Sequence, residues 1–318
     1  MKQNSTTVTL LVGGAGFIGQ ALANRLLVSR RRQVLVMGRS AQPAHLPPGA
    51  SYIQGDAADP SLMNSVLDDV DEVVDLAYAT VPKTSFENPL FDVVSNLPSS
   101  VNLLQVASRK SLKKYLLVSS GGTVYGQAQT LTIRETHPTD PISPYGISKL
   151  LTEKYATFFR QMEQLPVITA RPANPFGPMQ VGKTAQGFIG AAIAAIRRRQ
   201  SVTVYGARGT IRDYIYIDDL ASALAALLES GHVGGTYNIG TGIGTDNMDV
   251  LEHLRPFAML DRLALDVCPQ EERRFDVRSN VLDSSLLSAD TGWQPSIDLE
   301  EGLSRVWNET RSVYSTCS

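Results

Sequence analysis

The stretch "LLVGGAGFIGQAL" at residues 10–22 decides the fold of this chain. An apolar, strand-like run leads into glycines spaced Gly14-x-Gly16-x-x-Gly19, and residues 20–27 then repeat apolar side chains at helical spacing. A strand, a glycine turn and a helix in this order let backbone N–H groups approach a pyrophosphate at the helix N-terminus. The stretch therefore predicts a dinucleotide-binding unit.

Strands and helices alternate after this unit. Strands are predicted at residues 8–12, 33–37, 71–79, 114–120 and 166–172, and helices near residues 20–27, 61–69, 89–109 and from Pro144 onward. The strands are continuously apolar, which suits a sheet that is covered on both faces. We therefore expect an α/β fold with a doubly wound parallel sheet.

The pattern becomes less regular beyond Pro172. We expect a loop at residues 174–187, a helix at 187–199, a strand at 201–206, a helix at 217–230, a strand at 236–240 that returns to the main sheet, short elements after about 243, and a last helix at 299–312. The sequence thus predicts a dinucleotide-binding domain over residues 1–172, whose sheet is completed by segments near 201–240. Residues 173–318 would form a smaller, interleaved α/β substrate region.

The composition excludes several classes of protein. The chain of 318 residues is 43% hydrophobic and 19% charged, and its formal net charge of -2 lacks the basic surplus that nucleic-acid binding requires. The two cysteines, Cys268 and Cys317, have no CxxC spacing, and the four histidines are scattered, so we expect neither a disulfide framework nor a metal site. The apolar run at the N-terminus is too short for a signal peptide or a membrane span, which makes the cytoplasm the expected location.

The end of the second strand bears on cofactor choice. A site that selects NAD usually has an Asp or Glu about twenty residues after the glycine motif, where it accepts hydrogen bonds from the ribose. Gly38 and Arg39 occupy this place. No carboxylate repels a 2′-phosphate there and a guanidinium could bind one, although Arg39 could also stack on the adenine or point to solvent. This feature favours NADP. Asp56, in the stretch "QGDAAD" before the helix near 61–69, is a candidate partner for the adenine amino group.

The stretch "PYGISK" at residues 144–149 contains a candidate proton-transfer pair. Tyr145 and Lys149 are four residues apart and share one helix face. A free tyrosine titrates near 10, and lowering its pKa by about 3 units takes about 4 kcal/mol. One unit charge at about 4 Å supplies that order of energy at an effective dielectric near 20, so a lysine cation and an oxidised nicotinamide ring are adequate. The alternative is an ordinary amphipathic helix with a packed aromatic ring and a solvated lysine.

Three hydroxyl groups lie at or just after the end of the strand at 114–120. Ser119, Ser120 and Thr123 lie in "LLVSSGGTVYG", at the strand end where open parallel sheets bind ligands. They could orient a substrate alcohol beside Tyr145. The alternative is a polar loop that caps the next turn.

Together these motifs resemble the extended short-chain dehydrogenase/reductase family, and within it the nucleotide-sugar epimerases and dehydratases of the UDP-glucose 4-epimerase kind. The resemblance runs from about residue 8 to 308 and includes "GGAGFIG", "SSGGTVYG", "PYGISK", "RPANPFGP", "RDYIYIDDLA", "YNIGTG" and "TGWQP". It implies a Rossmann-like fold, Tyr145 as the acid/base, and Lys149 as the residue that holds the cofactor ribose and tunes Tyr145. It also implies a homodimer formed through the helices at 89–109 and 144–163.

The contacts expected from these motifs fall into two sets. The expected cofactor contacts are Gly13, Gly16, Phe17, Ile18, Gly19, Arg39, Asp56, Ala57, Leu76, Ala77, Ala79, Asn96, Ser119, Tyr145, Lys149 and Pro172. The expected contacts with a uracil-nucleotide diphosphate sugar are Thr80, Thr123, Asn174, Arg212, Arg273 and Asp276. Two arginines suit a diphosphate because guanidinium–phosphate contacts are strong, although Arg212 could instead pair with Asp213 or Asp218.

Departures from the family pattern limit the choice of reaction. Gly121 stands where the family has its catalytic serine, so Ser120 or Thr123 would take the role, and we favour Thr123. Family dehydratases carry an Asp-Glu pair where this chain has Gly122 and Thr123, which disfavours dehydration. The leading hypothesis is a nucleotide-sugar 4-epimerase with tightly bound NAD. The alternatives are an NADPH-dependent 4-ketoreductase of a deoxysugar nucleotide and a non-catalytic dinucleotide sensor.

Overall fold

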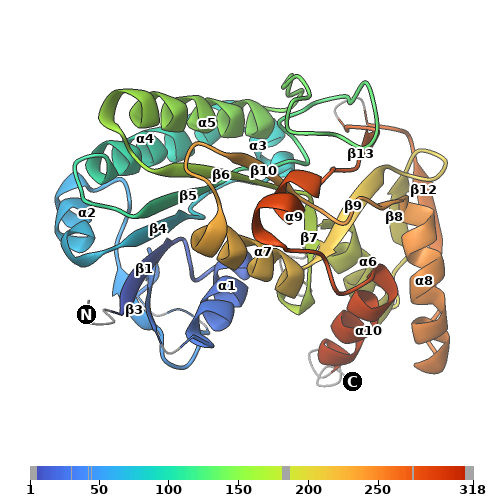
Figure 1. The fold of residues 1–318 in the computed structure, drawn as a ribbon. Helices are drawn as coiled ribbons and strands as arrows, with labels where there is room; N and C mark the ends of the chain where they lie inside the picture. The colour runs from blue at the N-terminus through green and yellow to red at the C-terminus, as the bar shows by residue number, and fades with distance from the viewer. Residues whose placement is uncertain are drawn as a thin grey trace.

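The computed structural model describes residues 6–29, 31–41, 43, 45–180, 187–273 and 276–311. Its centre is a seven-stranded parallel sheet with the order β3-β2-β1-β4-β5-β6-β10 (Figure 1). Its strands are β1 (Thr7–Val12), β2 (Arg32–Gly38), β3 (Ser51–Gln54), β4 (Glu72–Asp75), β5 (Lys114–Val118), β6 (Val167–Pro172) and β10 (Thr236–Ile239). The predicted doubly wound α/β fold is confirmed.

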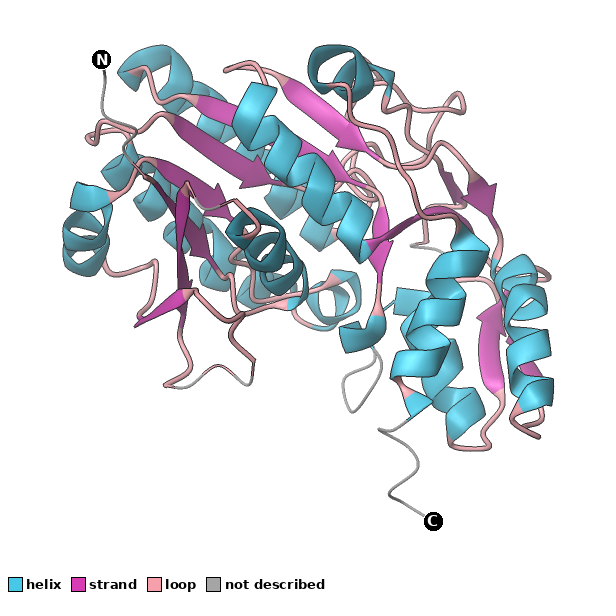
Figure 2. Ribbon diagram, turned by 60° about the horizontal axis from the view of Figure 1, so that its bottom comes forward, coloured by secondary structure: helices cyan, strands magenta, loops and turns pink. Residues whose placement is uncertain are grey.

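Helices cover both faces of this sheet (Figures 1 and 2). One face is covered by α2 (Pro60–Val66), α4 (Pro89–Ala107) and α5 (Pro144–Glu163), and the other by α1 (Phe17–Leu27) and α7 (Ile217–Ser230). Because side chains alternate along a strand, Leu10 and Val12 pack into one core and Leu11 packs into the other. Burial on both faces explains the continuous apolar runs of the strands.

The strand order reverses between β1 and β4. From β1 the chain proceeds outward to β2 and β3, and from β4 it proceeds in the opposite direction to β5, β6 and β10. Open α/β sheets bind ligands beyond the carboxyl ends of the strands at such a reversal. The glycine loop follows β1 and residues 76–80 follow β4, so both border this position.

The C-terminal half adds two small sheets. The first has the order β11 (Gly244–Thr245), β9 (Ile211–Tyr216), β13 (Ser279–Asn280), with β7 (Asn174–Phe176) also paired to β9. The second pairs β8 (Val202–Tyr205) with β12 (Val267–Gln270). Of the two strands expected between 201 and 240, β10 therefore joins the main sheet and β8 does not. The domain boundary at residue 172 stays a prediction.

The remaining helices are α3 (Pro82–Glu87), α6 (Gly187–Arg197), α8 (Asn247–Leu260), α9 (Ser285–Thr291) and α10 (Leu299–Glu309), with 3₁₀ turns at Leu67–Asp69 and Pro178–Gln180. The sequence did not indicate α3 or α8. The expectation of only short elements after residue 243 is wrong, because α8 has 14 residues and contains Pro256 in its interior. A proline there normally argues against a helix. Residues 181–186 of the predicted loop and Cys317 lie outside the described residues.

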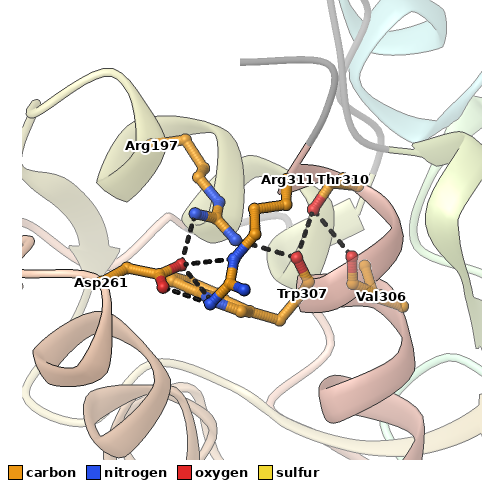
Figure 3. Close-up of polar contacts among 6 residues, drawn as sticks. All are labelled: Arg197, Asp261, Val306, Trp307, Thr310 and Arg311. Carbon is orange, nitrogen blue, oxygen red and sulfur yellow. Dashed lines mark hydrogen bonds and ion pairs between the residues drawn. The ribbon is translucent and has the colours of Figure 1, made fainter. Parts of the chain in front are cut away.

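A polar cluster fixes the C-terminal helices to one another (Figure 3). Asp261, directly after α8, accepts hydrogen bonds from Arg197 of α6 (2.6 Å), from the Trp307 indole of α10 (2.9 Å) and from Arg311. The Arg197 guanidinium lies 4.0 Å from the Trp307 ring centroid. The cluster thereby stabilises the region that contributes the candidate substrate residues.

The described residues contain no helix long and apolar enough to cross a membrane. In the same part of the chain, no three or more His, Cys, Asp or Glu side chains gather in a way that could hold a metal ion.

Candidate active site

The glycine loop joins strand β1 closely to helix α1. Gly13 has φ +76°, a left-handed conformation that glycine adopts without strain. A Cβ built at Gly19 would lie 2.4 Å from Gly14 Cα, so the helix approaches the loop this closely only because both residues are glycine. Gly16 caps the helix, whose first turn has neither an acidic residue nor a side-chain cap. Its backbone N–H groups can therefore bind an anion, as a pyrophosphate requires.

The end of β2 carries no carboxylate. Gly38 is the last residue of the strand, and the side chain of Arg39 is exposed and forms no ion pair within the described part of the chain. The Tyr52 hydroxyl donates to the Ser40 carbonyl (2.6 Å) and lies 3.0 Å from a Cβ built at Gly38. The exposed guanidinium of Arg39 thus follows directly after Gly38, the position at which an NAD-selecting Asp or Glu would stand.

The other expected cofactor contacts lie at or near the same edge of the sheet. Strand β4 ends at Asp75, earlier than expected, and Leu76, Ala77 and Ala79 belong to the loop that follows. The Ala79 N–H donates to Asn96 Oδ1 (2.7 Å), which ties this loop to α4. Phe17 and Ile18 open α1, Asp56 and Ala57 follow β3, and Pro172 ends β6. Their contacts with a cofactor stay predictions.

Tyr145 and Lys149 lie in the first turns of α5, which starts where the sequence predicts. Ser143 caps the helix and Pro144 occupies its first position. Both catalytic candidates therefore extend from a rigid element. The Lys149 ammonium donates to the Val118 carbonyl at the end of β5 (3.0 Å), so it lies at the carboxyl edge of the sheet.

Lys149 is buried and Tyr145 is partly buried, and burial changes both pKa values. Burial raises the pKa of the Tyr145 phenol, and the Asp92 carboxylate raises it further. Burial lowers the pKa of Lys149 to about 8, although Asp75, Glu153 and Asp92 favour its charged form. The Lys149 ammonium is 5.9 Å from the Tyr145 ring centroid. The lysine alone does not make the phenol acidic, so Tyr145 is protonated at neutral pH in the protein without cofactor.

The three candidate hydroxyls have different partners. Ser119 donates to Glu153, so its hydroxyl is engaged inside the protein. Ser120 is close enough to the Tyr145 phenol to lower its pKa, which favours the ionised form. Thr123 Oγ1 is buried and has no hydrogen-bond partner among the described residues. Ser120 is therefore the hydroxyl in contact with Tyr145, and the preference for Thr123 as the catalytic hydroxyl stays a prediction.

Gly121 cannot carry the serine that the family pattern has at this position. A Cβ there would lie 2.6 Å from Leu282 Cδ1 and 2.7 Å from the Arg171 carbonyl oxygen. Gly121→Ser is therefore expected to lower the free energy of unfolding by about 1–3 kcal/mol. Urea denaturation measures this, with Gly122→Ser as the matched control, because a Cβ at Gly122 meets its nearest neighbour at 3.7 Å. Equal stability of the two variants would contradict the steric argument.

A buried ionic network supports the loop after β5. Arg171 of β6 donates to Glu153 of α5 from Nε (3.0 Å) and Nη2 (2.6 Å), and to the Tyr125 hydroxyl from Nη1 (2.9 Å). Tyr125 in turn donates to Asn238 of β10 (2.7 Å). Together with the bond from Ser119, this network fixes both ends of residues 119–125 to the main sheet and to the helix of Tyr145.

Two of the expected substrate residues come from paired strands. Asn174 lies on β7 and Arg212 on β9, which pairs with β7. Arg212 does not pair with the acids considered as its alternative partners. Asp213 accepts hydrogen bonds from Thr241 and from backbone N–H groups, and Asp218 pairs with Arg305. Burial lowers the pKa of Arg212, whose Nη1 donates only to a backbone carbonyl in the described residues (2.9 Å).

The other substrate residues are already engaged with protein groups. Arg273 pairs with Asp276 (2.9 Å) and lies 4.1 Å from the Tyr205 ring centroid. Both are close enough to Arg212 to influence its pKa, so the three gather on one side of the site. Thr80 donates its hydroxyl to the buried Asp92. Its contact with a substrate stays a prediction.

Three further residues at this site were not anticipated. Asp92 is fully buried and accepts hydrogen bonds from Thr80 and from Ser148 (2.5 Å), which lies between the two catalytic candidates. The Tyr78 ring contacts both Tyr145 and Lys149. The sequence offered one signal for Tyr78, an aromatic residue among the small residues of "LAYAT", and none for a buried acid on α4.

The third of these residues is Asn280 on β13. Its side chain is fully buried and donates to the Gly121 carbonyl (3.0 Å). Asn280 is also in register with Arg212 of β9. Asn280 thereby links the loop that carries Ser120 and Thr123 to strand β9, which carries Arg212.

Comparison with known proteins agrees with this geometry. The NAD dependent epimerase/dehydratase family matches residues 9–240. A putative UDP-glucose 4-epimerase of Methanocaldococcus jannaschii is 30% identical over 94% of this chain and 97% of its own length. A dTDP-4-dehydro-6-deoxyglucose reductase of Escherichia coli is 28% identical over 95% of this chain and 97% of its own, and dTDP-glucose 4,6-dehydratases are similarly related.

Solved structures give the same result. The UDP-glucose 4-epimerase of Thermotoga maritima with UDP-glucose has a TM-score of 0.89 at 30% identity, with 96% of this chain and 99% of that chain covered. The UDP-glucose 4-epimerase of Thermus thermophilus with NAD has a TM-score of 0.86 at 30% identity, with the same coverage. The fold of this chain is thus shared with these two epimerases over nearly its whole length.

Proposed function

Because the chain belongs to the NAD-dependent epimerase/dehydratase family, we propose that it is a nucleotide-sugar 4-epimerase of the UDP-hexose type. The observation that carries the proposal is the group of Tyr145, Ser120 and Lys149 at the carboxyl edge of the sheet, beside the glycine loop. Gly122 and Thr123 supply no acid pair for dehydration. Epimerisation needs one proton acceptor, which this group provides, and a redox cofactor that stays bound.

The residues present fit a nicotinamide dinucleotide. The N-terminus of α1 has no competing cap or acid, and the glycines leave room for a close backbone approach to a pyrophosphate. Lys149 has one donor engaged with Val118 and further donors left for ribose hydroxyls. Such a cofactor would supply the redox chemistry, as a reversible hydride acceptor for C4 of the sugar.

In the proposed mechanism Tyr145 moves the proton. As phenolate it accepts the proton of the sugar 4-hydroxyl and later returns it to the 4-keto oxygen. Ser120 and Thr123 donate hydrogen bonds that orient that oxygen. Lys149 adds a positive charge that favours phenolate. Since burial and Asp92 raise the pKa of Tyr145, the proposed phenolate would need a second cation in addition to Lys149.

The proposed substrate is a uracil-nucleotide diphosphate sugar. Arg212 and Arg273 would bind the diphosphate, and the partial burial of Arg212 would strengthen such a contact because water screens it less. Asn174 lies beside Gly122 and would bind near the sugar. The relatives named UDP-glucose 4-epimerase support a UDP-hexose over other nucleotide sugars.

The test is turnover without added cofactor. We expect the purified protein to retain NAD and to convert UDP-glucose, or another member of a panel of UDP- and dTDP-sugars, into its C4 epimer, as followed by NMR. The reaction should stop at a mixture of both epimers from either direction. Stoichiometric consumption of NADPH with a 4-keto sugar nucleotide would contradict the proposal and support a reductase.

The 4-ketoreductase is the second candidate because Gly38 and Arg39 suit a 2′-phosphate. If it holds, Arg39→Ala should raise the Kd of NADPH about tenfold or more, since a charged hydrogen bond of about 1.5–3 kcal/mol is lost, and leave the Kd of NADH unchanged. Fluorescence titration measures the Kd of NADPH and of NADH for both proteins, and the NADH titration is the control. Equal effects on both cofactors would place Arg39 on the adenine instead.

We also propose a homodimer through α4 and α5. These neighbouring helices expose large apolar side chains that a monomer seldom exposes together, namely Leu90, Phe91, Val94, Ile147, Leu151, Phe158 and Met162. Sedimentation equilibrium tests the proposal, because a dimer has twice the chain mass of 34.5 kDa.

A further inference from the structure

Tyr78 contacts both members of the candidate catalytic pair. It lies in the loop after β4, between Ala77 and Ala79. The Lys149 ammonium is 3.9 Å from the centroid of the Tyr78 ring, nearer than to the Tyr145 ring. The Tyr78 and Tyr145 rings meet edge to face, with centroids 5.1 Å apart and planes at 74°. The Tyr78 ring thus presents its face to the ammonium and packs edge to face with Tyr145.

The surroundings of Lys149 make this contact consequential. Three carboxylates favour its charged form from different elements, Asp75 at the end of β4, Asp92 on α4 and Glu153 on α5. Burial opposes them and prevails, so the pKa of Lys149 falls to about 8. The face of an aromatic ring attracts a cation through its quadrupole, and this attraction increases where water is excluded. A ring face at 3.9 Å therefore adds to the interactions that keep this buried ammonium charged.

Tyr78 also has no competing charge of its own. Its hydroxyl is buried beside Ser148 and Asp92, and burial with the neighbouring Asp92 raises its pKa well above the ordinary value. It stays a neutral phenol while Lys149 titrates. The ring is therefore a fixed, uncharged surface against which the ammonium rests.

We propose that Tyr78 is a positioning residue that holds the Lys149 ammonium in place and charged through its ring face, and sets the orientation of Tyr145 through its edge. The Val118 carbonyl and the Tyr78 ring would then hold the ammonium from two sides and leave an N–H group for a cofactor ribose. The inference rests on the proposed function only in that it treats Lys149 and Tyr145 as the catalytic pair.

The experiment changes the electrostatics of the ring and keeps its shape. Phenylalanine and its mono-, di- and trifluorinated analogues are incorporated in place of Tyr78, because each fluorine weakens the negative ring face with little change in volume. The titration midpoint of Lys149 is read from NMR of protein labelled with [ε-¹³C]lysine, and the Lys149→Met spectrum assigns its signal. All variants are compared as purified, at equal cofactor occupancy.

We expect phenylalanine to keep the midpoint close to that of the natural protein and the fluorinated series to lower it stepwise, by about one pH unit in total. A midpoint that stays constant along the series would overturn the proposal. Tyr78→Leu, which removes the ring face, should lower kcat about tenfold and leave KM little changed, and Tyr78→Phe should restore kcat. Equal kcat values for the leucine and phenylalanine variants would also overturn it.

The titration needs no sugar, so the two proposals fail separately. A protein that converts no nucleotide sugar, but shows the stepwise fall, refutes the proposed function and leaves the contact of Tyr78 with Lys149 established. Normal turnover with a constant Lys149 midpoint supports the proposed function and refutes the role of Tyr78. Should the leucine variant not fold, the fluorinated series still decides the matter.

Discussion

Replacing Tyr145 by phenylalanine is expected to lower kcat by about 10³-fold or more, because general acid–base catalysis by a placed side chain contributes about 10²–10⁴-fold and no other group here can take the proton. The ring itself remains, so its edge-to-face contact with Tyr78 is preserved. Stability and cofactor binding should change little. NMR of the interconversion of both epimers measures the rate, and cofactor fluorescence measures binding.

Tyr155→Phe is the matched control, because Tyr155 lies on the same helix and its side chain is partly exposed. Its rate should equal that of the natural protein. If Tyr145→Phe retained a tenth of the activity, another group would have to accept the sugar proton, and Ser120 would be the first to examine. If both variants were inactive, the loss would come from the helix and not from the phenol.

Glu153→Gln is expected to lower the free energy of unfolding by about 3–5 kcal/mol, because removal of one partner from a buried ion pair leaves the other charge uncompensated. The side chains of Glu153 and Arg171 are only 7% and 9% exposed. This loss is a large part of the 5–15 kcal/mol that a domain normally has. Urea denaturation at pH 7 measures it. Activity should fall as well, since the same network fixes the loop of Ser120.

Two controls test whether the loss comes from the unpaired buried charge of Arg171. Glu252→Gln removes an acid from an exposed pair with Arg255 and should leave the stability unchanged. A double variant, Glu153→Leu with Arg171→Met, removes both charges and should be less destabilised than the sum of its single variants. A loss below about 1 kcal/mol for Glu153→Gln would show that water reaches the Arg171 guanidinium.

Much of the fold and part of the site could be predicted because the signals are local. The glycine loop needs neighbours only a few residues apart, and Gly13 and Gly19 have the conformation and close approach that their spacing indicates. Tyr145 and Lys149 share a helix face because they are four residues apart. Alternating strands and helices then determine the parallel sheet with few alternatives.

The remainder depends on contacts between distant residues. Asp92 reads as a solvated helix residue until α5 covers it and Ser148 donates to it. Gly121 reads as a missing catalytic group until the packing of Leu282 shows that no side chain fits. The pKa of Tyr145 was expected to be lowered by Lys149 together with an oxidised nicotinamide ring. The sequence does not reveal that burial and an acid from another helix oppose this by raising the pKa.

The hydrogen bond from Asn280 to Gly121 has a consequence for synthesis of the chain. The cofactor cradle, Tyr145 and Lys149 all precede residue 240, whereas the donor that fixes the Gly121 carbonyl comes from a strand 159 residues later than its partner. Chains fold from the N-terminus as they leave the ribosome. The Gly121 carbonyl therefore gains this hydrogen bond only after Asn280 has been synthesised and has left the ribosome.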